Sequence, residues 1–169
     1  MSGPMSNSRK PAVFLDRDGT LNEDRDYSHR IQDMVLIPGA ARAVRRFQED
    51  GFWTVIVTNQ SGIARGYFDE AALALFNAEL LRQLAEGGAT IDLILHCPHH
   101  PDITGPCACR KPGAGMVKVA CAQLPIDLKR SLLIGDRLSD MGCAEAAGIA
   151  GYLFPGGDLD EFCREHALP

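Results

Sequence analysis

Short apolar runs rich in β-branched residues alternate along this chain with longer segments in which apolar residues recur at helical spacing. The short runs predict five strands, at residues 12–15, 53–57, 93–95, 131–134 and 151–154. Strands that alternate with helices are typical of a parallel sheet wrapped by helices. We therefore expect an α/β fold, a Rossmann-like three-layer sandwich with a mainly parallel central sheet.

Four helices are predicted between these strands, and their ends carry recognisable signals. The first runs from Gly39 to a stop at Gly51, and the second runs from an N-cap at Asp69 to Gly87. The others are expected near residues 115–124 and 139–148. No element is predicted after Pro155.

The composition bounds the class of protein. A length of 169 residues fits one domain, 1–169, and we expect residues 1–10 to form a flexible N-terminus. With 46% hydrophobic and 23% charged residues, the chain is unlike disordered proteins. A formal charge of −5 without a basic stripe argues against nucleic acid as a partner. No apolar run reaches the roughly 20 residues of a membrane helix, and the start lacks the apolar core of a signal peptide. We expect a cytoplasmic monomer with no membrane partner.

Charged and hydroxyl residues follow the predicted strands. Asp16 and Asp18 come after the first strand, residues 58–61 come after the second, and Asp136 comes after the fourth. Arg110 and Lys111 end the loop that follows the third strand. Because ligands bind outside the carboxyl ends of the strands in open parallel sheets, these four segments predict one shared site.

The pair Asp16 and Asp18 suits covalent catalysis. Two carboxylates two residues apart can converge on one substrate, while Gly19 permits the tight turn that leaves the strand. One carboxylate can attack phosphorus and form an acyl phosphate, and the other can move protons. The alternative is a solvated acidic turn, the commonest fate of such a short motif.

An attacking carboxylate and a phosphate repel each other, so such a site needs a cation and further donors. Mg²⁺ prefers oxygen ligands, which Asp16, Asp136, a backbone carbonyl near Asp18 and waters can supply. Asp140 lies one helical turn beyond Asp136, so it can contact the cation or orient its ligands. Lys111 offers a charge and Thr58 a hydroxyl to the phosphoryl group, although a solvated lysine and a capping threonine are equally open.

These residues, in this order, resemble the four motifs of the haloacid dehalogenase superfamily of phosphatases. The similar segments are residues 16–21, Thr58, Lys111 and residues 135–140, within a match over residues 12–154. The resemblance implies that Asp16 is the nucleophile and that Asp18 is the general acid and then the base. It also implies that Thr58 and Lys111 bind phosphate, and that Asp16, the Asp18 carbonyl and Asp136 hold Mg²⁺. The chain has no room for a cap domain.

Three cysteines and a histidine form a second cluster. Cys97-x-His99 and Cys107-x-Cys109 offer four ligands from two short arms, which suits a structural zinc ion. Zinc would staple the loop of residues 97–110 and so fix the direction of Lys111. His96 or His100 could replace His99, and reduced packing cysteines or a Cys97–Cys107 disulfide are the alternatives. We expect the other cysteines, at positions 121, 143 and 163, to pack as small apolar residues.

The zinc loop narrows the resemblance to a cap-less branch that contains heptose bisphosphate phosphatases and histidinol-phosphate phosphatases. The substrate-contacting stretches of that branch correspond here to Asp24, Arg25, Asp26, Tyr27, Asn59, Gln60, Ser61 and Arg110. Arg110 suits a distal phosphate or sugar hydroxyls because its guanidinium is a planar fork.

Three features depart from the heptose pattern: the carboxylate at Asp26, the short span between His99 and Cys107, and the early end after Pro155. A carboxylate near the pocket could repel a bisphosphate or attract a cationic amine such as that of histidinol. The sequence therefore predicts a Mg²⁺-dependent phosphomonoesterase that acts on a small phosphorylated sugar, with the heptose bisphosphate first. A phosphorylated amino alcohol such as histidinol phosphate is the alternative substrate, and a zinc-containing module that binds a phosphorylated ligand is the non-enzymatic alternative.

Overall fold

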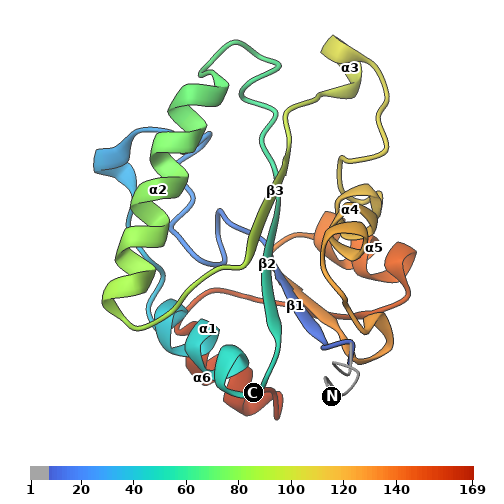
Figure 1. The fold of residues 1–169 in the computed structure, drawn as a ribbon. Helices are drawn as coiled ribbons and strands as arrows, with labels where there is room; N and C mark the ends of the chain where they lie inside the picture. The colour runs from blue at the N-terminus through green and yellow to red at the C-terminus, as the bar shows by residue number, and fades with distance from the viewer. Residues whose placement is uncertain (1–7) are drawn as a thin grey trace, which may run out of the picture.

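The computed structural model describes residues 8–169, whose centre is one parallel sheet (Figure 1). Its order is β3-β2-β1-β4-β5, and every neighbouring pair is parallel. The strands are β1 (Ala12–Leu15), β2 (Trp53–Asn59), β3 (Leu93–Cys97), β4 (Leu132–Gly135) and β5 (Ala150–Leu153). The prediction of a Rossmann-like parallel sheet is confirmed, and all the carboxyl ends meet at one edge.

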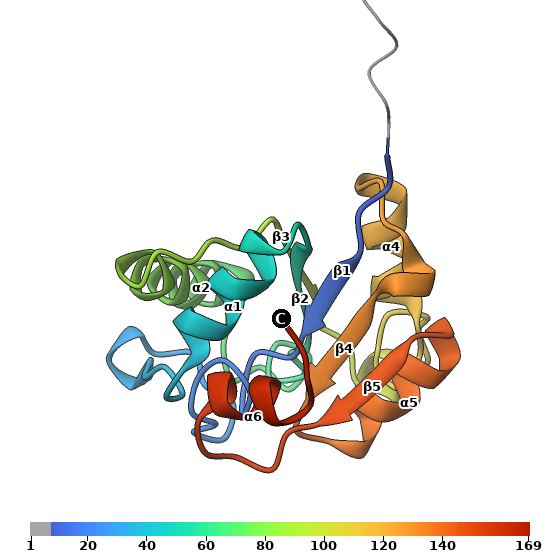
Figure 2. The same ribbon diagram turned by 90° about the horizontal axis from the view of Figure 1, so that it is seen from below.

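Helices cover both faces of this sheet, as the view from below shows (Figure 2). One face carries α1 (Ala40–Glu49), α2 (Glu70–Glu86) and α6 (Leu159–Glu165). The other carries α4 (Gly115–Gln123) and α5 (Leu138–Ala147). Short elements fill three of the connections: the 3₁₀ turns at Ile31–Asp33 and Leu128–Arg130, and α3 (Pro101–Thr104) in the cysteine loop. Within residues 8–169 nothing resembles a cap domain.

Two hydrophobic cores lie on the two faces of the sheet, and β1 contributes side chains to both of them. Val13 and Leu15 belong to the core under α1, α2 and α6, whereas Ala12 and Phe14 belong to the core under α4 and α5. Successive side chains of a strand point to opposite faces, so a strand covered on both sides has an unbroken apolar run. The first strand is therefore central and buried on both faces, which suits it to hold side chains in place at its end.

The C-terminal segment forms α6, an element that the sequence pattern did not predict. Asp158 caps this helix by accepting a hydrogen bond from the Glu161 N–H at 3.0 Å. Asp160 accepts hydrogen bonds from Arg46 of α1 at 2.8 Å and from Arg164 at 3.0 Å. Charge pairing thus joins α6 to α1, a signal that the search for apolar periodicity misses.

Two smaller expectations meet different outcomes. Of the N-terminus expected to be flexible, residues 1–7 lie outside the described residues, but the Lys10 N–H donates to the Pro125 carbonyl at 3.0 Å. The prediction that cysteines outside the loop pack as small apolar residues is confirmed for Cys143 and Cys163, which are buried. It is wrong for Cys121, which is exposed on α4. The reason is that Cys121 directly follows Ala120, the last buried position of this helix.

None of the helices within residues 8–169 is long and apolar enough to cross a bilayer. The monomeric state and the cytoplasmic location stay predictions.

Candidate active site

Asp16 and Lys111 form a buried ion pair at the carboxyl edge of the sheet. Asp16 follows β1 directly, and its N–H continues the parallel ladder by donating to the Ile134 carbonyl at 3.0 Å. The Lys111 Nζ lies 2.9 Å from Asp16 Oδ1 and 2.5 Å from Asp140 Oδ1, and it also donates to the Val57 carbonyl at 2.8 Å. Burial alone would lower the pKa of Lys111, but Asp16 and Asp140 raise it, so the lysine stays charged.

Asn59 aligns the segment that carries this lysine. Its side-chain carbonyl accepts the Lys111 N–H at 3.0 Å, and its amide donates to the Lys111 carbonyl at 3.1 Å. Because Asn59 is the last residue of β2, the lysine loop is tied to the sheet at its edge. Asn59 thus has a structural role at the site, and the substrate-binding role predicted for it stays a prediction.

Asp16, Asp136 and Asp140 bring carboxylate oxygens within 4.8 Å of one another. Asp136 Oδ1 is buried and has no hydrogen-bond partner in the described part of the chain. Burial, and then the neighbouring Asp16, raises the pKa of Asp136 to about 7. A cluster with this unbalanced negative charge and an orphaned oxygen fits a hard divalent cation.

Gly19 makes room for this cluster. Its φ of +84° is a left-handed conformation that glycine adopts without strain. A Cβ at this position would also lie only 2.1 Å from Asp136 Oδ2. The glycine after the two aspartates is therefore required by both the backbone and the approach of Asp136.

Asp18 is held by a set of donors of its own. Its Oδ1 accepts from Arg17 Nε at 3.1 Å and from Asn22 Nδ2 at 2.9 Å. Its Oδ2 accepts from Arg17 Nη2 at 3.0 Å and from Gln60 Nε2 at 3.0 Å. Gln60 also donates to Thr58 Oγ1 at 3.0 Å, so it bridges two residues that the motifs assign to phosphate chemistry.

A cleft of about 390 Å³ opens above these residues. Most of the predicted site residues line it, namely Asp16, Asp18, Asp24, Asp26, Tyr27, Thr58, Asn59, Gln60, Ser61, Arg110, Lys111 and Asp140. Two residues predicted for the phosphate and magnesium site do not line it: Arg25, which bonds Glu23 at 2.6 Å on the surface, and Asp136, whose carboxylate lies against Gly19. The structure adds three lining residues that the sequence reasoning missed, Arg65, Arg137 and Ser139. Arg137 directly follows the predicted metal ligand Asp136, and Ser139 stands at the predicted start of a helix. Their positions alone could have suggested them.

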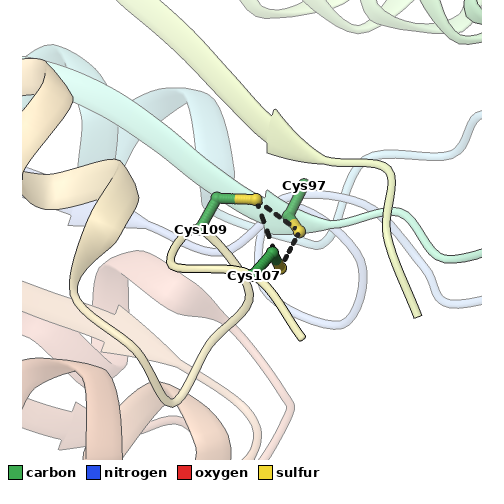
Figure 3. A group of neighbouring side chains, drawn as sticks. All are labelled: Cys97, Cys107 and Cys109. Atoms are coloured by element: carbon green, nitrogen blue, oxygen red, sulfur yellow. Dashed lines mark hydrogen bonds between the residues drawn. The ribbon is translucent and has the colours of Figure 1, made fainter. Parts of the chain in front are cut away.

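The cysteine loop gathers three thiols. Cys97 ends β3, and the sulfur atoms of Cys107 and Cys109, on the loop that follows, point toward its sulfur (Figure 3). Cys109 Sγ lies 2.8 Å from Cys97 Sγ, and the other two sulfur–sulfur distances are 3.6 Å. Three thiols grouped this tightly are typical of a zinc or disulfide site.

The histidine ligand is not brought into this group, since within residues 8–169 the three cysteines cluster without any histidine nitrogen. Arg110 Nη1 donates to the His99 carbonyl at 3.3 Å. The His96 ring pairs with Glu70, and the His100 ring accepts from the Asp102 N–H. The choice of His99 as fourth ligand stays a prediction.

Comparisons with known proteins agree with the geometry. A family model described as HAD-hydrolase-like matches residues 108–165. The D-glycero-β-D-manno-heptose-1,7-bisphosphate 7-phosphatase of Rhodopseudomonas palustris is 41% identical over 165 residues, 95% of this chain and 92% of the relative. The enzyme of the same name from Haemophilus ducreyi is 46% identical over 145 residues, covering 83% and 80% of the two chains.

A solved structure of D,D-heptose 1,7-bisphosphate phosphatase from B. bronchiseptica, complexed with magnesium and phosphate, superposes with a TM-score of 0.80. It is 36% identical, and the match covers 94% of this chain and 88% of that one. The parallel sheet, the carboxylate cluster at its edge and this similarity over nearly the whole length agree. The chain therefore belongs to the haloacid dehalogenase-like hydrolases and, among them, to the family of the heptose-1,7-bisphosphate 7-phosphatases.

Proposed function

We propose that this protein is a Mg²⁺-dependent phosphatase that removes the C7 phosphate of D-glycero-β-D-manno-heptose 1,7-bisphosphate. The observation that carries the proposal is the Asp16 carboxylate at the end of β1, 2.9 Å from the buried Lys111 ammonium and open to the cleft. The named activity of relatives that are 41% and 46% identical supports the substrate.

Covalent catalysis by Asp16 accounts for the arrangement of the cleft. An oxygen of Asp16 attacks phosphorus, and the bond between phosphorus and the sugar oxygen breaks while Asp18 gives that oxygen a proton. The ionised Asp18 then takes a proton from a water molecule that attacks the phosphorus of the acyl phosphate. Phosphate leaves and both carboxyl groups return to their starting states. Lys111 and Thr58 stabilise the charge on the phosphoryl oxygens.

Mg²⁺ fits the chain through Asp16, the Asp18 carbonyl and Asp136. The orphaned Oδ1 of Asp136 supports this assignment. Asp140 instead orients its neighbours, because its Oδ1 accepts from Lys111 and its Oδ2 accepts from the Arg137 N–H at 3.1 Å. When bound, the cation neutralises the repulsion between the carboxylates and the phosphate dianion.

Zinc fits the three thiols of the cysteine loop, with His99 as the proposed fourth ligand. The loop leads within two residues from Cys109 to Lys111. Zinc bound there would keep the loop in one conformation and so assist Asn59 in aiming the lysine. The contribution to catalysis is indirect, because the cluster lies outside the residues that line the cleft.

The arginines of the cleft support a site for the second phosphate of a bisphosphate. Three arginines line it, Arg65, Arg110 and Arg137, in addition to the Lys111 that faces the reacting group. Arg137 pairs with Asp24 at 2.8 Å, while no carboxylate among the described residues pairs with Arg65 or Arg110. We assign the distal phosphate to Arg110, since a guanidinium can bind it with two hydrogen bonds.

The test is phosphate release, with Mg²⁺, from the heptose bisphosphate, histidinol phosphate and a panel of sugar monophosphates. We expect kcat/KM for the heptose bisphosphate to exceed the others by several hundred-fold, about 3–4 kcal/mol of discrimination. Asp16→Asn is the matched control, because it keeps the shape and removes the nucleophile. A preference for histidinol phosphate would overturn the assignment of the heptose bisphosphate as substrate. If no phosphate were released from any ester, the result would point to the module that binds a phosphorylated ligand without catalysis.

A further inference from the structure

Arg17 stands between the two catalytic aspartates, yet neither the motif nor the proposed mechanism uses it. Its side chain is fully buried, the largest such side chain in the described part of the protein. A buried guanidinium must be compensated by hydrogen bonds and negative charge, since its desolvation is costly. The partners that compensate it therefore indicate what it does.

The guanidinium is satisfied by three separate segments. Nε and Nη2 form a fork on the two oxygens of Asp18, at 3.1 and 3.0 Å. Nη1 donates to Asn77 Oδ1 of α2 at 3.0 Å, and Nη2 also donates to the Ser28 carbonyl at 2.8 Å. The ring of Phe76 lies 4.4 Å from the guanidinium carbon.

These contacts fix the direction of Asp18. A two-pronged contact allows a carboxylate little rotation, whereas a single hydrogen bond leaves it free to turn. The guanidinium is itself immobile because α2 and the Ser28 backbone hold it from behind. Asp18 thus faces the cleft while the immobile guanidinium holds its carboxylate, and 18% of the Asp18 side chain is exposed.

The same guanidinium reaches the wall of the cleft. Ser28 closes the turn of residues 25–28 by accepting the Arg25 N–H with its hydroxyl at 2.9 Å. Asp26 and Tyr27 of this turn line the cleft and have φ angles of 50° and 59°. Left-handed conformations are costly for such residues and persist only where the surroundings impose them.

From these contacts we infer that Arg17 is a positioning residue: it aims the Asp18 carboxyl group at the leaving oxygen and ties that direction to the turn of residues 25–28. The inference rests on the proposed role of Asp18 as proton donor. Loss of the fork would leave Asp18 held only by single hydrogen bonds from Asn22 and Gln60. These two contacts restrict its direction less than the fork does, and a misplaced acid transfers its proton poorly.

Leaving-group dependence separates this role from a structural one. Phenyl phosphate and p-nitrophenyl phosphate have nearly the same shape, but phenolate is the poorer leaving group and needs the proton more. The value of kcat/KM reports the steps up to departure of the phenol, so the later hydrolysis does not enter. Asp18→Asn serves as the reference, and its loss should be at least about 10-fold greater for phenyl phosphate.

We expect Arg17→Met to lose about 10-fold more kcat/KM for phenyl phosphate than for p-nitrophenyl phosphate. Arg17→Lys keeps the charge without the fork and should show a smaller bias. Leu80→Ala, a fully buried position of α2 among the hydrophobic core residues, is the control for lost stability and should show none. Should Arg17→Met fail to fold, Arg17→Lys and Asn77→Ala decide, with a bias of about threefold in each.

The outcomes are distinct. Equal losses on both esters in the Arg17 variants, beside a clear bias in Asp18→Asn, would overturn the inference and leave the proposed function intact. A gain on phenyl phosphate in Arg17→Met would also overturn it. Absence of bias in Asp18→Asn itself would overturn the proposed role of Asp18 and the inference with it.

Discussion

Replacement of Gly19 by alanine should disable the site through one added methyl group. The new Cβ would lie 2.1 Å from Asp136 Oδ2, whereas ordinary contact begins at 3.4 Å. Asp136 or the turn must therefore retreat by about 1 Å, and a displacement of this size in an active site costs about 100-fold in rate. The φ of +84° adds about 1–2 kcal/mol of backbone strain.

Gly51→Ala is the matched control. Gly51 has a φ of +82°, but nothing lies within 4 Å of the Cβ that alanine would add. Both variants should lose about 1–2 kcal/mol to strain, which lowers Tm by about 2–8 °C in a domain of this size. Only Gly19→Ala should lose kcat/KM by about 100-fold.

The assays are thermal unfolding and phosphate release from the heptose bisphosphate, with Mg²⁺, for both variants and the wild type. Equal kcat/KM in Gly19→Ala and Gly51→Ala would refute the reasoning, because the strain is shared and only the approach of Asp136 differs. Loss of activity in both would refute it as well, since Gly51 lies before the start of β2, at the edge of the sheet opposite the cleft.

Three further predictions concern charge and metal. Saturating Mg²⁺, at about 100 times its Kd, should add about 2.7 kcal/mol of stability, measured as a rise in Tm that Asp136→Asn abolishes. Cys107→Ser should remove stoichiometric zinc, measured by elemental analysis, and reduce activity while the sheet stays folded; zinc retained at one per chain would contradict the ligand set. Burial alone would raise the pKa of Asp160, but hydrogen bonds to Arg46 and Arg164 lower it below 3.8. Asp160→Asn should therefore lower the free energy of unfolding, measured in urea at neutral pH, by about 1–3 kcal/mol. The difference from the wild type should shrink below about pH 4, because Asp160 of the wild type is then protonated. A difference independent of pH would contradict this.

The three inner strands of the sheet, β2, β1 and β4, could be predicted from the sequence because they are buried on both faces. Such strands are unbroken apolar runs, and the polar residues that follow them mark their carboxyl ends. This is why Asp16 and Thr58 could be placed at one edge from the sequence alone, together with Lys111, which ends the loop that follows β3. The strand β2 extends two residues beyond the predicted end, through Asn59, because the apolar pattern stops where the site begins.

The remaining features depend on contacts between segments distant in sequence. Arg17 resembles any solvated arginine until α2 and the Ser28 carbonyl are placed around it. Asp160 is likewise only an acidic residue in a short tail until Arg46 of α1 approaches it. Arg65 enters the cleft through a turn whose course periodicity does not describe. Pairings of this kind leave no local signal in one sequence.

The central claim is covalent catalysis by Asp16, and a rapid acid quench during the first turnover tests it most directly. The wild-type protein, mixed with the heptose bisphosphate and Mg²⁺, should carry one phosphoryl group on the peptide that contains Asp16, as measured by mass spectrometry. Asp16→Asn should carry none and should lose at least about 10³-fold in kcat. A phosphoryl group on a different residue, or turnover by Asp16→Asn near the wild-type rate, would contradict the account.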